Sequence, residues 1–260
     1  MPKAQDEREM YVVKSNDLIR KSRYSLTLQQ QKIVLYAISK IKPHDNIFTE
    51  YTFKIIDFCR VCGLSMSGSY YYDSIKSDLN ELLQRSWITL NDGTEMTISW
   101  IGDAKIKQDD GTISFRFNPN MAPYLFELKE RYTQYKLESV LWFKSTYSIR
   151  LYELLRSYTT QKNLDEYISK DIEMGLDELR SYLGAENKYQ SWGDFERYIL
   201  RKAKDEINSY SKDIHIEYDV IKEGRQAKKV CFTISTYTFS DYMTAEKAKE
   251  TRLDKAGKRA

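Results

Sequence analysis

Histidine and cysteine are scarce in this chain of 260 residues, which contains two histidines and three cysteines. His44 and His215 stand alone in the sequence, so a metal site built on clustered histidines is not expected. Three cysteines cannot form a disulfide framework, and they fit a reducing compartment. Cys59 and Cys62 form a C-x-x-C without a second pair, so we expect both sulfurs to be small apolar groups on one helix face. We expect neither a metal nor another cofactor.

Long apolar stretches are also lacking. No run is long enough to span a bilayer, and the opening segment "MPKAQDEREMYVVK" has no apolar core of a signal peptide. With 41% hydrophobic and 30% charged residues, the composition is that of a globular chain. The net charge of +3 is small and selects no class of ligand by itself. We therefore expect a cytoplasmic protein without a membrane partner.

A short internal repeat is present. The segment "SRYSLTL" (22–28) returns as "STYSIRL" (145–151), with four of the seven positions identical and Leu26 replaced by Ile149. A chain of 260 residues is long enough for two domains of ordinary size. The repeat therefore predicts a duplicated domain.

Each half has the pattern of a helix-turn-helix. Thr27 and Gln30 form a capping pair before a helical apolar pattern, and the second copy of the repeat predicts a helix from about 146 to 159. Short amphipathic helices follow at 56–60 and 176–180, and each precedes a turn and a longer helix. The apolar positions of the two longer helices are Ile75, Leu79 and Leu83 in the first half and Phe195, Ile199, Ala203 and Ile207 in the second.

After each long helix the hydrophobic period changes to 2, which is typical of strands. The turn signals Asn91-Asp92-Gly93 and Asp109–Gly111 separate the strands of the first half. A helix-turn-helix followed by a β-hairpin is a winged helix. The predicted strands are 87–90, 96–106 and 112–117 in the first half and 214–221 and 229–237 in the second.

The expected fold is therefore α+β, with two tandem winged-helix domains related by internal duplication. We place the N-terminal domain at residues 1–135, the C-terminal domain at 136–240 and a charged tail at 241–260.

Three connecting segments also have local signals. Asn118 followed by Pro119 predicts the cap and first turn of a short helix. Residues 132–137 indicate an extended connection between the halves, and the polar stretch 159–175 is predicted to be rich in loops.

The face opposite the buried stripe of each long helix indicates which domain suits DNA. In the second half this face carries Arg197, Arg201, Lys204 and Asn208, whereas Lys202 points nearer the buried side. Cations and a polar amide on one helix face suit phosphates and base edges in a major groove. The equivalent face of the first half is neutral to acidic and would repel phosphates. Its residues are Tyr70, Asp73, Ser77, Glu81 and Gln84.

The hairpins show the same contrast. Residues 1–130 carry 17 basic and 17 acidic side chains, so the net charge of +3 lies in the rest of the chain. The second domain is therefore expected to be the main DNA reader. The hairpin residues compared are Lys222, Arg225, Lys228 and Lys229 in the second half and Asp103, Asp109 and Asp110 in the first.

A basic helix face alone is often only a solvated surface, but here it coincides with a basic hairpin, and this favours DNA binding. The first domain is expected to add an auxiliary contact and dimerisation. The predicted DNA-binding residues are Ser145, Ser148, Arg150, Lys188, Gln190, Ser191, Arg197, Arg201, Lys204, Asn208, Lys222, Arg225, Lys228 and Lys229 in the second domain and Ser69 and Tyr70 in the first.

Several stretches resemble the initiator proteins of iteron-controlled, theta-replicating plasmids of the RepE, Pi and RepB type, and most of all the RepB-type members of Gram-positive plasmids. They include "VVKSNDLIRKSRYSLTLQQQKIVLYAISKI", "YTQYKLE", "STYSIRLYELLRSY" and "FERYILRKAKDEINSYSKDIHIEYDVIKEGRQAKKVCFTI". The resemblance covers residues from about 12 to 236, and its most specific part lies at 206–234.

The resemblance implies tandem winged helices that bind iterons in a plasmid origin as monomers. It also implies dimers that repress their own promoter, melting of nearby origin DNA, and contacts with the host replicative helicase and host initiator. The family has a run of basic residues directly after the helix phenylalanine. Here Glu196, Arg197 and Tyr198 follow Phe195, so we expect base contacts from Arg197 and Arg201 instead.

Three alternatives stay open beside a non-enzymatic initiator. A dedicated transcriptional repressor has the same fold, and DNA beside the gene separates the two, since tandem direct repeats favour initiation and a lone inverted repeat favours repression. A nicking enzyme with a tyrosine nucleophile needs clustered histidines or carboxylates, which the sequence lacks. A protein-interaction module fits the first domain only.

Overall fold

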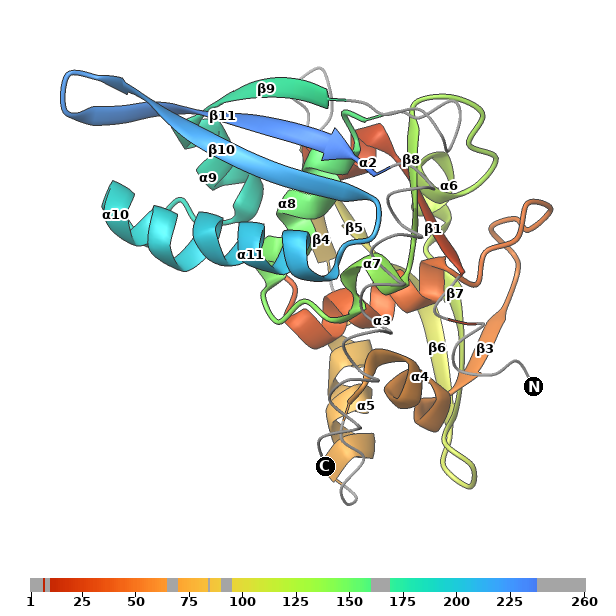
Figure 1. The fold of residues 1–260 in the computed structure, drawn as a ribbon. Coiled ribbons are helices and arrows are strands. Elements are labelled where there is room, and N and C mark those ends of the chain that lie inside the picture. The colour runs from red at the N-terminus through yellow and green to blue at the C-terminus, as the bar shows by residue number, and fades with distance from the viewer. Residues whose placement is uncertain are drawn as a thin grey trace, which may run out of the picture.

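The structure is a computed structural model (Figure 1). The predicted turn at 91–93 and the predicted tail at 241–260 lie outside the residues that it describes. The described residues are 7, 10–64, 70–83, 85–89, 95–159 and 169–237.

The first half contains the predicted helix-turn-helix, and its strands form two three-stranded antiparallel sheets ordered β2-β4-β5 and β3-β7-β6. Strands are confirmed in the regions with a period of 2, but the stretch 96–106 expected as one strand breaks at Trp100 into two strands, β5 and β6, that belong to different sheets. The turn between the last two strands is made by Gly111, whose φ of 63° favours glycine. The elements are α2 (Asn16–Lys21), β2 (Ser22–Arg23), α3 (Leu28–Ile38), β3 (Tyr51–Lys54), α4 (Ile55–Cys62), α5 (Tyr70–Leu82), β4 (Arg85–Thr89), β5 (Glu95–Ser99), β6 (Ile101–Lys107) and β7 (Thr112–Phe117).

The second half repeats this plan with a longer hairpin. One prediction about it is wrong, because part of the stretch expected to be loop-rich forms a strand, β9, that pairs with β11 along its whole length. Side chains of a strand point alternately to its two faces, which fits this strand, since Met174 is buried while its strand neighbours are exposed or half-buried. The elements are α8 (Thr146–Arg156), β9 (Ser169–Gly175), α9 (Leu176–Leu183), α10 (Trp192–Phe195), η2 (Glu196–Leu200), α11 (Arg201–Tyr210), β10 (Ile214–Glu223) and β11 (Gln226–Thr236).

A small sheet closes the first half and leads into the second. Residues expected to be extended form β8, and Asn118 caps a short helix that starts at Pro119, so both of these predictions are confirmed. Strand β8 does more than connect, because it pairs with the strand that opens the described chain. The elements are β1 (Tyr11–Ser15), η1 (Pro119–Met121), α6 (Ala122–Leu125), β8 (Tyr132–Lys136) and α7 (Glu138–Leu141).

The two halves have matching helix ends. Helices α4 and α9 each have eight residues and end at a glycine in the left-handed region, Gly63 and Gly184. The ring of Trp142 lies 3.0 Å from where a Cβ at Gly63 would be, so any larger residue there would clash. The prediction that a short helix occupies the same place in each half is therefore confirmed.

The seven-residue repeat does not mark equivalent positions of the two domains. Helix α3 begins after its N-cap Thr27, the sixth residue of the first copy, whereas α8 begins after Ser145, the first residue of the second copy. Only the last residue of the first copy is therefore helical, whereas all but the first residue of the second copy are helical. The halves are duplicated in fold, but the match between 22–28 and 145–151 is not aligned with that duplication.

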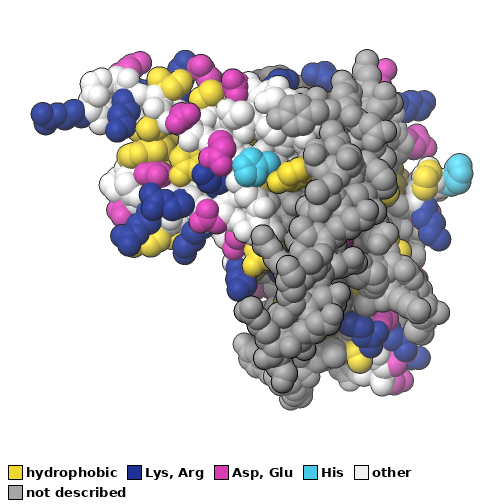
Figure 2. Space-filling model, viewed as in Figure 1, with side chains coloured by type: hydrophobic (Ala, Val, Ile, Leu, Met, Phe, Trp, Pro, Cys, Tyr) yellow, Lys and Arg dark blue, Asp and Glu magenta, His cyan; other side chains and the backbone are white. Residues whose placement is uncertain are grey.

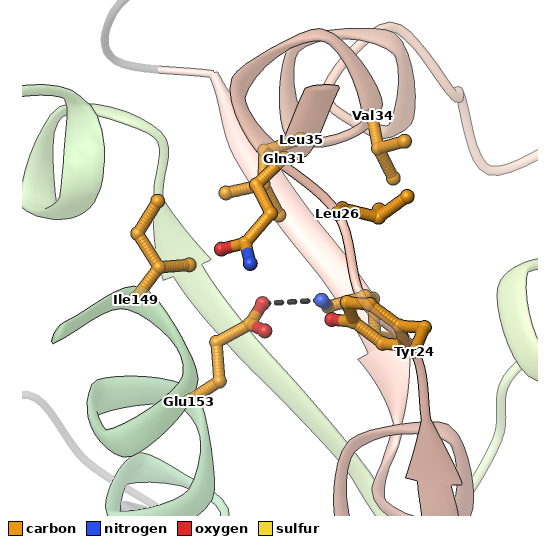
Figure 3. A pocket seen from close by; sticks show the side chains of 8 residues that line it. Tyr24, Leu26, Gln31, Val34, Leu35, Ile149 and Glu153 are labelled. Atoms are coloured by element: carbon orange, nitrogen blue, oxygen red, sulfur yellow. Dashed lines mark ion pairs between the residues drawn. The ribbon is translucent and has the colours of Figure 1, made fainter. Parts of the chain in front are cut away.

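The two copies of the repeat instead face each other across the junction of the halves. Tyr24 and Leu26 from the first copy and Ile149 from the second line one small cavity, and the ion-paired Lys14 and Glu153 line it as well (Figure 3). Both members of this ion pair are almost completely buried. Removing one partner of such a pair would leave the other charge buried without compensation, so each depends on the other for its place at this junction.

Candidate nucleic-acid interface

The long helix of the second half, residues 192–210, buries the predicted stripe. Phe195, Ile199, Ala203 and Ile207 are all 0% exposed. Ser191 caps the helix, since its hydroxyl accepts a hydrogen bond from the backbone N–H of Asp194. The side chains expected to read DNA therefore come from the opposite face, as the pattern predicted.

The middle of this helix is wider than an α-helix. Residues 196–200 form a π-helical segment, and the backbone N–H of Arg201 donates to the carbonyl oxygen of Glu196 five residues earlier. The extra residue in this turn rotates the C-terminal part of the helix relative to an α-helical wheel. Lys202, which we expected near the buried side, is exposed.

Arg197 and Arg201 lie on the exposed face, as predicted. Arg197 stands 5.6 Å from the ring centroid of Tyr198, and Tyr198 stacks on Tyr189 from the preceding turn at 5.4 Å. The guanidinium of Arg201 instead lies 3.2 Å from a carboxylate oxygen of Glu196. This hydrogen bond raises the pKa of Arg201.

The C-terminal part of the helix is tied to strand β10. Lys204 pairs with Glu217 at 2.5 Å, and His215 lies 3.3 Å from the other oxygen of that carboxylate. Asn208 donates to the carbonyl of Ile216 and accepts from its N–H, both at 2.8 Å. Both ends of the Asn208 amide thus join the helix to the sheet, and the DNA contact expected of Asn208 stays a prediction.

The turn before the helix exposes Lys188 and Gln190. The nearly buried guanidinium of Arg180 donates to both of their carbonyl oxygens, at 3.1 and 3.2 Å, and lies 4.3 Å from the ring centroid of Phe195. Arg180 thus fixes the turn against the helix. The sequence pattern missed it because an arginine in an amphipathic helix is typical of a solvated side chain.

The hairpin of β10 and β11 is the wing. Its turn contains Gly224 with a φ of 61°, and Lys222, Arg225 and Lys228 are exposed around it. Lys229 is also exposed but lies 3.4 Å from Glu173 of strand β9. The wing projects from the body on the same side as the start of the long helix (Figure 1).

The surface view shows how these charges are distributed. Lys and Arg side chains lie at the tip of the projecting wing and along the long helix below it, with Asp and Glu side chains between them (Figure 2). The face is therefore cationic but interrupted by carboxylates, which the helical spacing of the sequence alone did not show.

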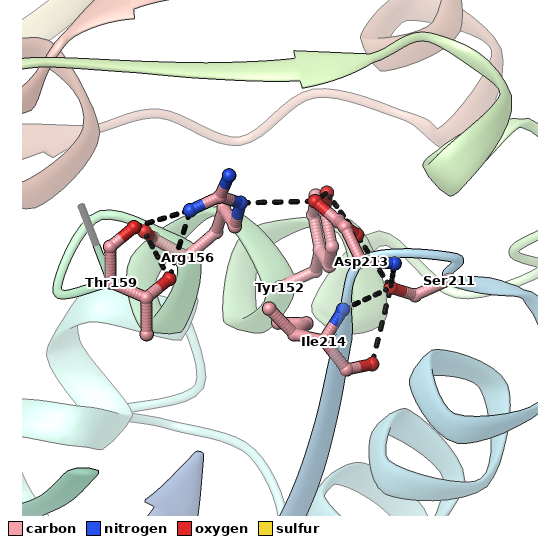
Figure 4. Close-up of polar contacts among 6 residues, drawn as sticks. All are labelled: Tyr152, Arg156, Thr159, Ser211, Asp213 and Ile214. Carbon is pink, nitrogen blue, oxygen red and sulfur yellow. Dashed lines mark hydrogen bonds and ion pairs between the residues drawn. The ribbon is translucent and has the colours of Figure 1, made fainter. Parts of the chain in front are cut away.

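A cluster of polar contacts holds the base of the wing (Figure 4). The carboxylate of Asp213, just before β10, accepts from the hydroxyls of Tyr152 and Ser211 and from Nε of Arg156, at 2.7 to 2.9 Å. Because Tyr152 and Arg156 belong to α8, this cluster fixes the wing relative to that helix. No sequence pattern pointed to it, since its members are far apart along the chain.

Two predicted DNA contacts in α8 are wrong because their side chains are buried. Ser148 is 0% exposed and Arg150 is 3% exposed. Arg150 donates to the carbonyls of Ser22 and Tyr182, at 2.9 and 2.6 Å, and lies 4.2 Å from the ring centroid of Tyr24 and 4.4 Å from that of Tyr182. It joins the two halves. Ser145 is half-buried and caps α8.

The predicted residues of the first domain are less fully described. Ser69 lies outside the described residues, and Tyr70 begins α5 but its side chain also lies outside them. Asp73, Ser77 and Glu81 are exposed on α5, so the neutral to acidic face is confirmed for the part that is described. The DNA contacts expected at Ser69 and Tyr70 stay predictions.

The two cysteines of the C-x-x-C, Cys59 and Cys62, are buried in the core on α4. The described residues hold no group of three or more His, Cys, Asp and Glu side chains placed to bind a metal ion. Among the described helices, none has the length and apolar character needed to cross a membrane.

Comparisons with known proteins give consistent matches. A family model described as "Initiator Replication protein, WH1" matches residues 11–156, and one described as "Initiator Rep protein, WH2" matches residues 175–240. A "Replication initiation protein" from Escherichia coli is 28% identical over 243 residues, which cover 91% of this chain and 73% of that protein.

Two further relatives are similar over different extents. The "PI protein" from Escherichia coli is 29% identical over 144 residues, covering 52% of this chain and 46% of that protein. A crystal structure of Pi initiator protein in complex with iteron DNA has a TM-score of 0.74 and 20% sequence identity, covering 88% of this chain and 98% of the other. At this identity the structural likeness supports the fold, the tandem winged helix.

Proposed function

The chain belongs to the initiator replication protein family, and on that premise we propose that it starts plasmid replication by binding iterons in the origin as double-stranded DNA. The observation that carries the proposal is the exposed long helix beside a basic wing in the second domain. A related initiator has been crystallised with iteron DNA. Membership of the family confirms the resemblance seen in the sequence.

In this proposal the helix and the wing have different roles. Arg197, near the start of the helix, is placed for base edges, where helix-turn-helix proteins read sequence. Lys222, Arg225 and Lys228 are flexible or exposed charges on the wing that suit phosphates of the adjacent backbone. Affinity then comes mainly from the wing, and base preference from the helix.

The two domains divide the labour in this proposal. Residues 136–240 are the main DNA reader, because the basic face and the basic wing both lie there. Residues 1–135 supply dimerisation and an auxiliary DNA contact, since the exposed face of α5 is neutral to acidic. The dimer binds an inverted repeat and represses its own promoter.

Opening of the origin follows from binding rather than from chemistry by this chain. The protein acts in the cytoplasm without enzymatic activity or a cofactor, and it recruits the host replicative helicase and host initiator to the melted DNA.

The test uses the DNA that flanks the gene. A small plasmid carrying only the gene and its flanking DNA should replicate, and deletion of tandem direct repeats from that DNA should abolish replication and the matching gel shift of the purified protein. Replication that persists without the direct repeats, together with binding to an inverted repeat alone, would instead identify a dedicated repressor.

A further inference from the structure

A carboxylate lies within the cationic face of the long helix. Glu196 directly follows the buried Phe195, and its side chain is 28% exposed. A carboxylate beside DNA repels phosphates and lowers affinity. Its presence near the start of the DNA-reading helix, beside Arg197, therefore calls for a compensating role.

The π-helical segment explains how Glu196 reaches its partner. In an α-helix, residues five apart point about 140° away from each other, so their side chains do not meet. Here the turn closes between Glu196 and Arg201, and the backbone bond between them is accompanied by the side-chain pair at 3.2 Å. The wider turn thus places this carboxylate against this guanidinium.

A third group supports the pair from the neighbouring strand. The hydroxyl of Tyr218 on β10 lies 3.5 Å from the same carboxylate oxygen that contacts Arg201. Burial and then the charge of Glu196 raise the pKa of Tyr218 to about 12, so its hydroxyl stays protonated and able to donate. Glu196 is therefore held from the helix and from the sheet.

We propose that Glu196 is a positioning residue that, with Tyr218, aims the guanidinium of Arg201 at a guanine in the major groove. This inference rests on the proposed function, since it assigns a second base-reading residue to the same helix. Arginine has five donors in a planar fork, and the contact with Glu196 occupies only Nη2 in the structure. Tyr218 also interacts with the guanidinium. The donors that Glu196 and Tyr218 leave unused suit the O6 and N7 acceptors of guanine, and a fixed guanidinium plane makes that contact selective.

The same carboxylate also lowers binding to the wrong DNA. Arg201 paired with Glu196 presents less net charge to a random phosphate backbone, so non-specific affinity falls. A guanine offers Arg201 two acceptors that a random site lacks. Specificity therefore increases through a penalty on wrong sites as well as through a contact with the right one.

The experiment compares two substitutions that remove the same charge. Glu196→Gln removes the partner of Arg201, and Glu217→Gln removes the partner of Lys204, which lies farther along the same helix. The probe is a duplex that the wild-type protein selects from a randomised library, together with a copy of it for each single base-pair substitution. Binding of each probe, and of an unselected duplex, is titrated at several salt concentrations.

Both variants should bind the unselected duplex several-fold more tightly, with a steeper salt dependence, because each frees one cation for phosphates. Only Glu196→Gln should lose base preference, by about tenfold at one guanine position. Tyr218→Phe should give a smaller loss at that position. Glu196→Gln should add nothing to the preference already lost in Arg201→Ala.

The outcomes separate this inference from the proposed function. If the wild-type protein selects no preferred duplex, the proposed function fails. If it selects one but Glu196→Gln and Glu217→Gln have the same base preference at every position, the positioning role of Glu196 is wrong while the proposed function stands. Should Glu196→Gln fail to fold, unchanged base preference in Tyr218→Phe overturns the inference.

Discussion

Replacing Arg150 by alanine should destabilise the protein without directly changing its contacts with DNA. The guanidinium is 3% exposed and lies between the two halves of the chain. Burial by itself would lower its pKa, but the neighbouring Tyr182, Tyr24 and Glu153 more than offset this and raise it, so the group stays charged. A buried group that stays charged is stable in the interior only where neighbouring groups stabilise the charge.

The size of the effect follows from those partners. Arg150→Ala removes a charged donor from the buried carbonyls of Ser22 and Tyr182, and each such loss costs about 1–3 kcal/mol. Contacts with two tyrosine rings add roughly 0.5–2 kcal/mol each. Release of a buried charge offsets part of this sum, because its desolvation costs several kcal/mol. We expect a net loss of about 3 kcal/mol in the free energy of unfolding.

Urea unfolding of the full chain measures this loss. Arg116→Ala is a matched control, since Arg116 forms ion pairs with Glu50 and Asp103 at the surface and each is expected to contribute about 0–1 kcal/mol. Stability of Arg150→Ala equal to that of Arg116→Ala would refute the interface role. So would a weaker, less salt-dependent affinity for DNA with unchanged stability, which is the signature of a phosphate contact.

Three further outcomes are expected. Affinity for DNA should fall steeply as salt rises, and Lys228→Ala should weaken binding to all sequences alike and reduce the slope of a log–log plot by about one unit. Arg197→Ala should cost about 1–3 kcal/mol on the selected duplex and relax preference at one base position, whereas equal weakening on all duplexes would show that Arg197 does not read bases. Burial raises the pKa of Tyr152 well above 10, so its contribution to stability is complete below about pH 10 and is lost as pH rises further. Tyr152→Phe should therefore flatten the fall in melting temperature above about pH 10.

Periodicity was sufficient to predict the long helices and the hairpin of the second half. The stripe of Phe195, Ile199, Ala203 and Ile207 predicted the buried face of the long helix because apolar residues at helical spacing have few other solutions. The same helical spacing predicted that Arg197 is exposed on the opposite face. The wing was also predictable, since alternating residues flank a glycine turn at Gly224.

The details of the DNA-reading face were not predictable from that helical spacing. Glu196 and Arg201 stand five apart, a spacing that pairs no side chains on an α-helix, so no signal pointed to the π-helical segment. Asn208 was assigned to the reading face correctly by angle, but its amide was free to bind strand β10 instead. A wheel gives the direction of a side chain and not the partner that tertiary structure brings to it.

Arg150 shows the same limit at the junction of the halves. Its position in α8 is consistent with an exposed or a buried side chain, and only the packing of α8 on the first half decides between them. The missed strand β9 has a similar cause, because its partner β11 lies more than fifty residues later in the chain. Both errors concern contacts between distant segments, which local patterns do not encode.

The repeat that first suggested duplication has a different physical basis. Its two copies differ in conformation, yet Tyr24 of one stacks on Arg150 of the other, and Leu26 and Ile149 line the same cavity. The matching segments 22–28 and 145–151 therefore meet at the junction between the domains, while the duplication of the fold is recorded in the helix ends at Gly63 and Gly184.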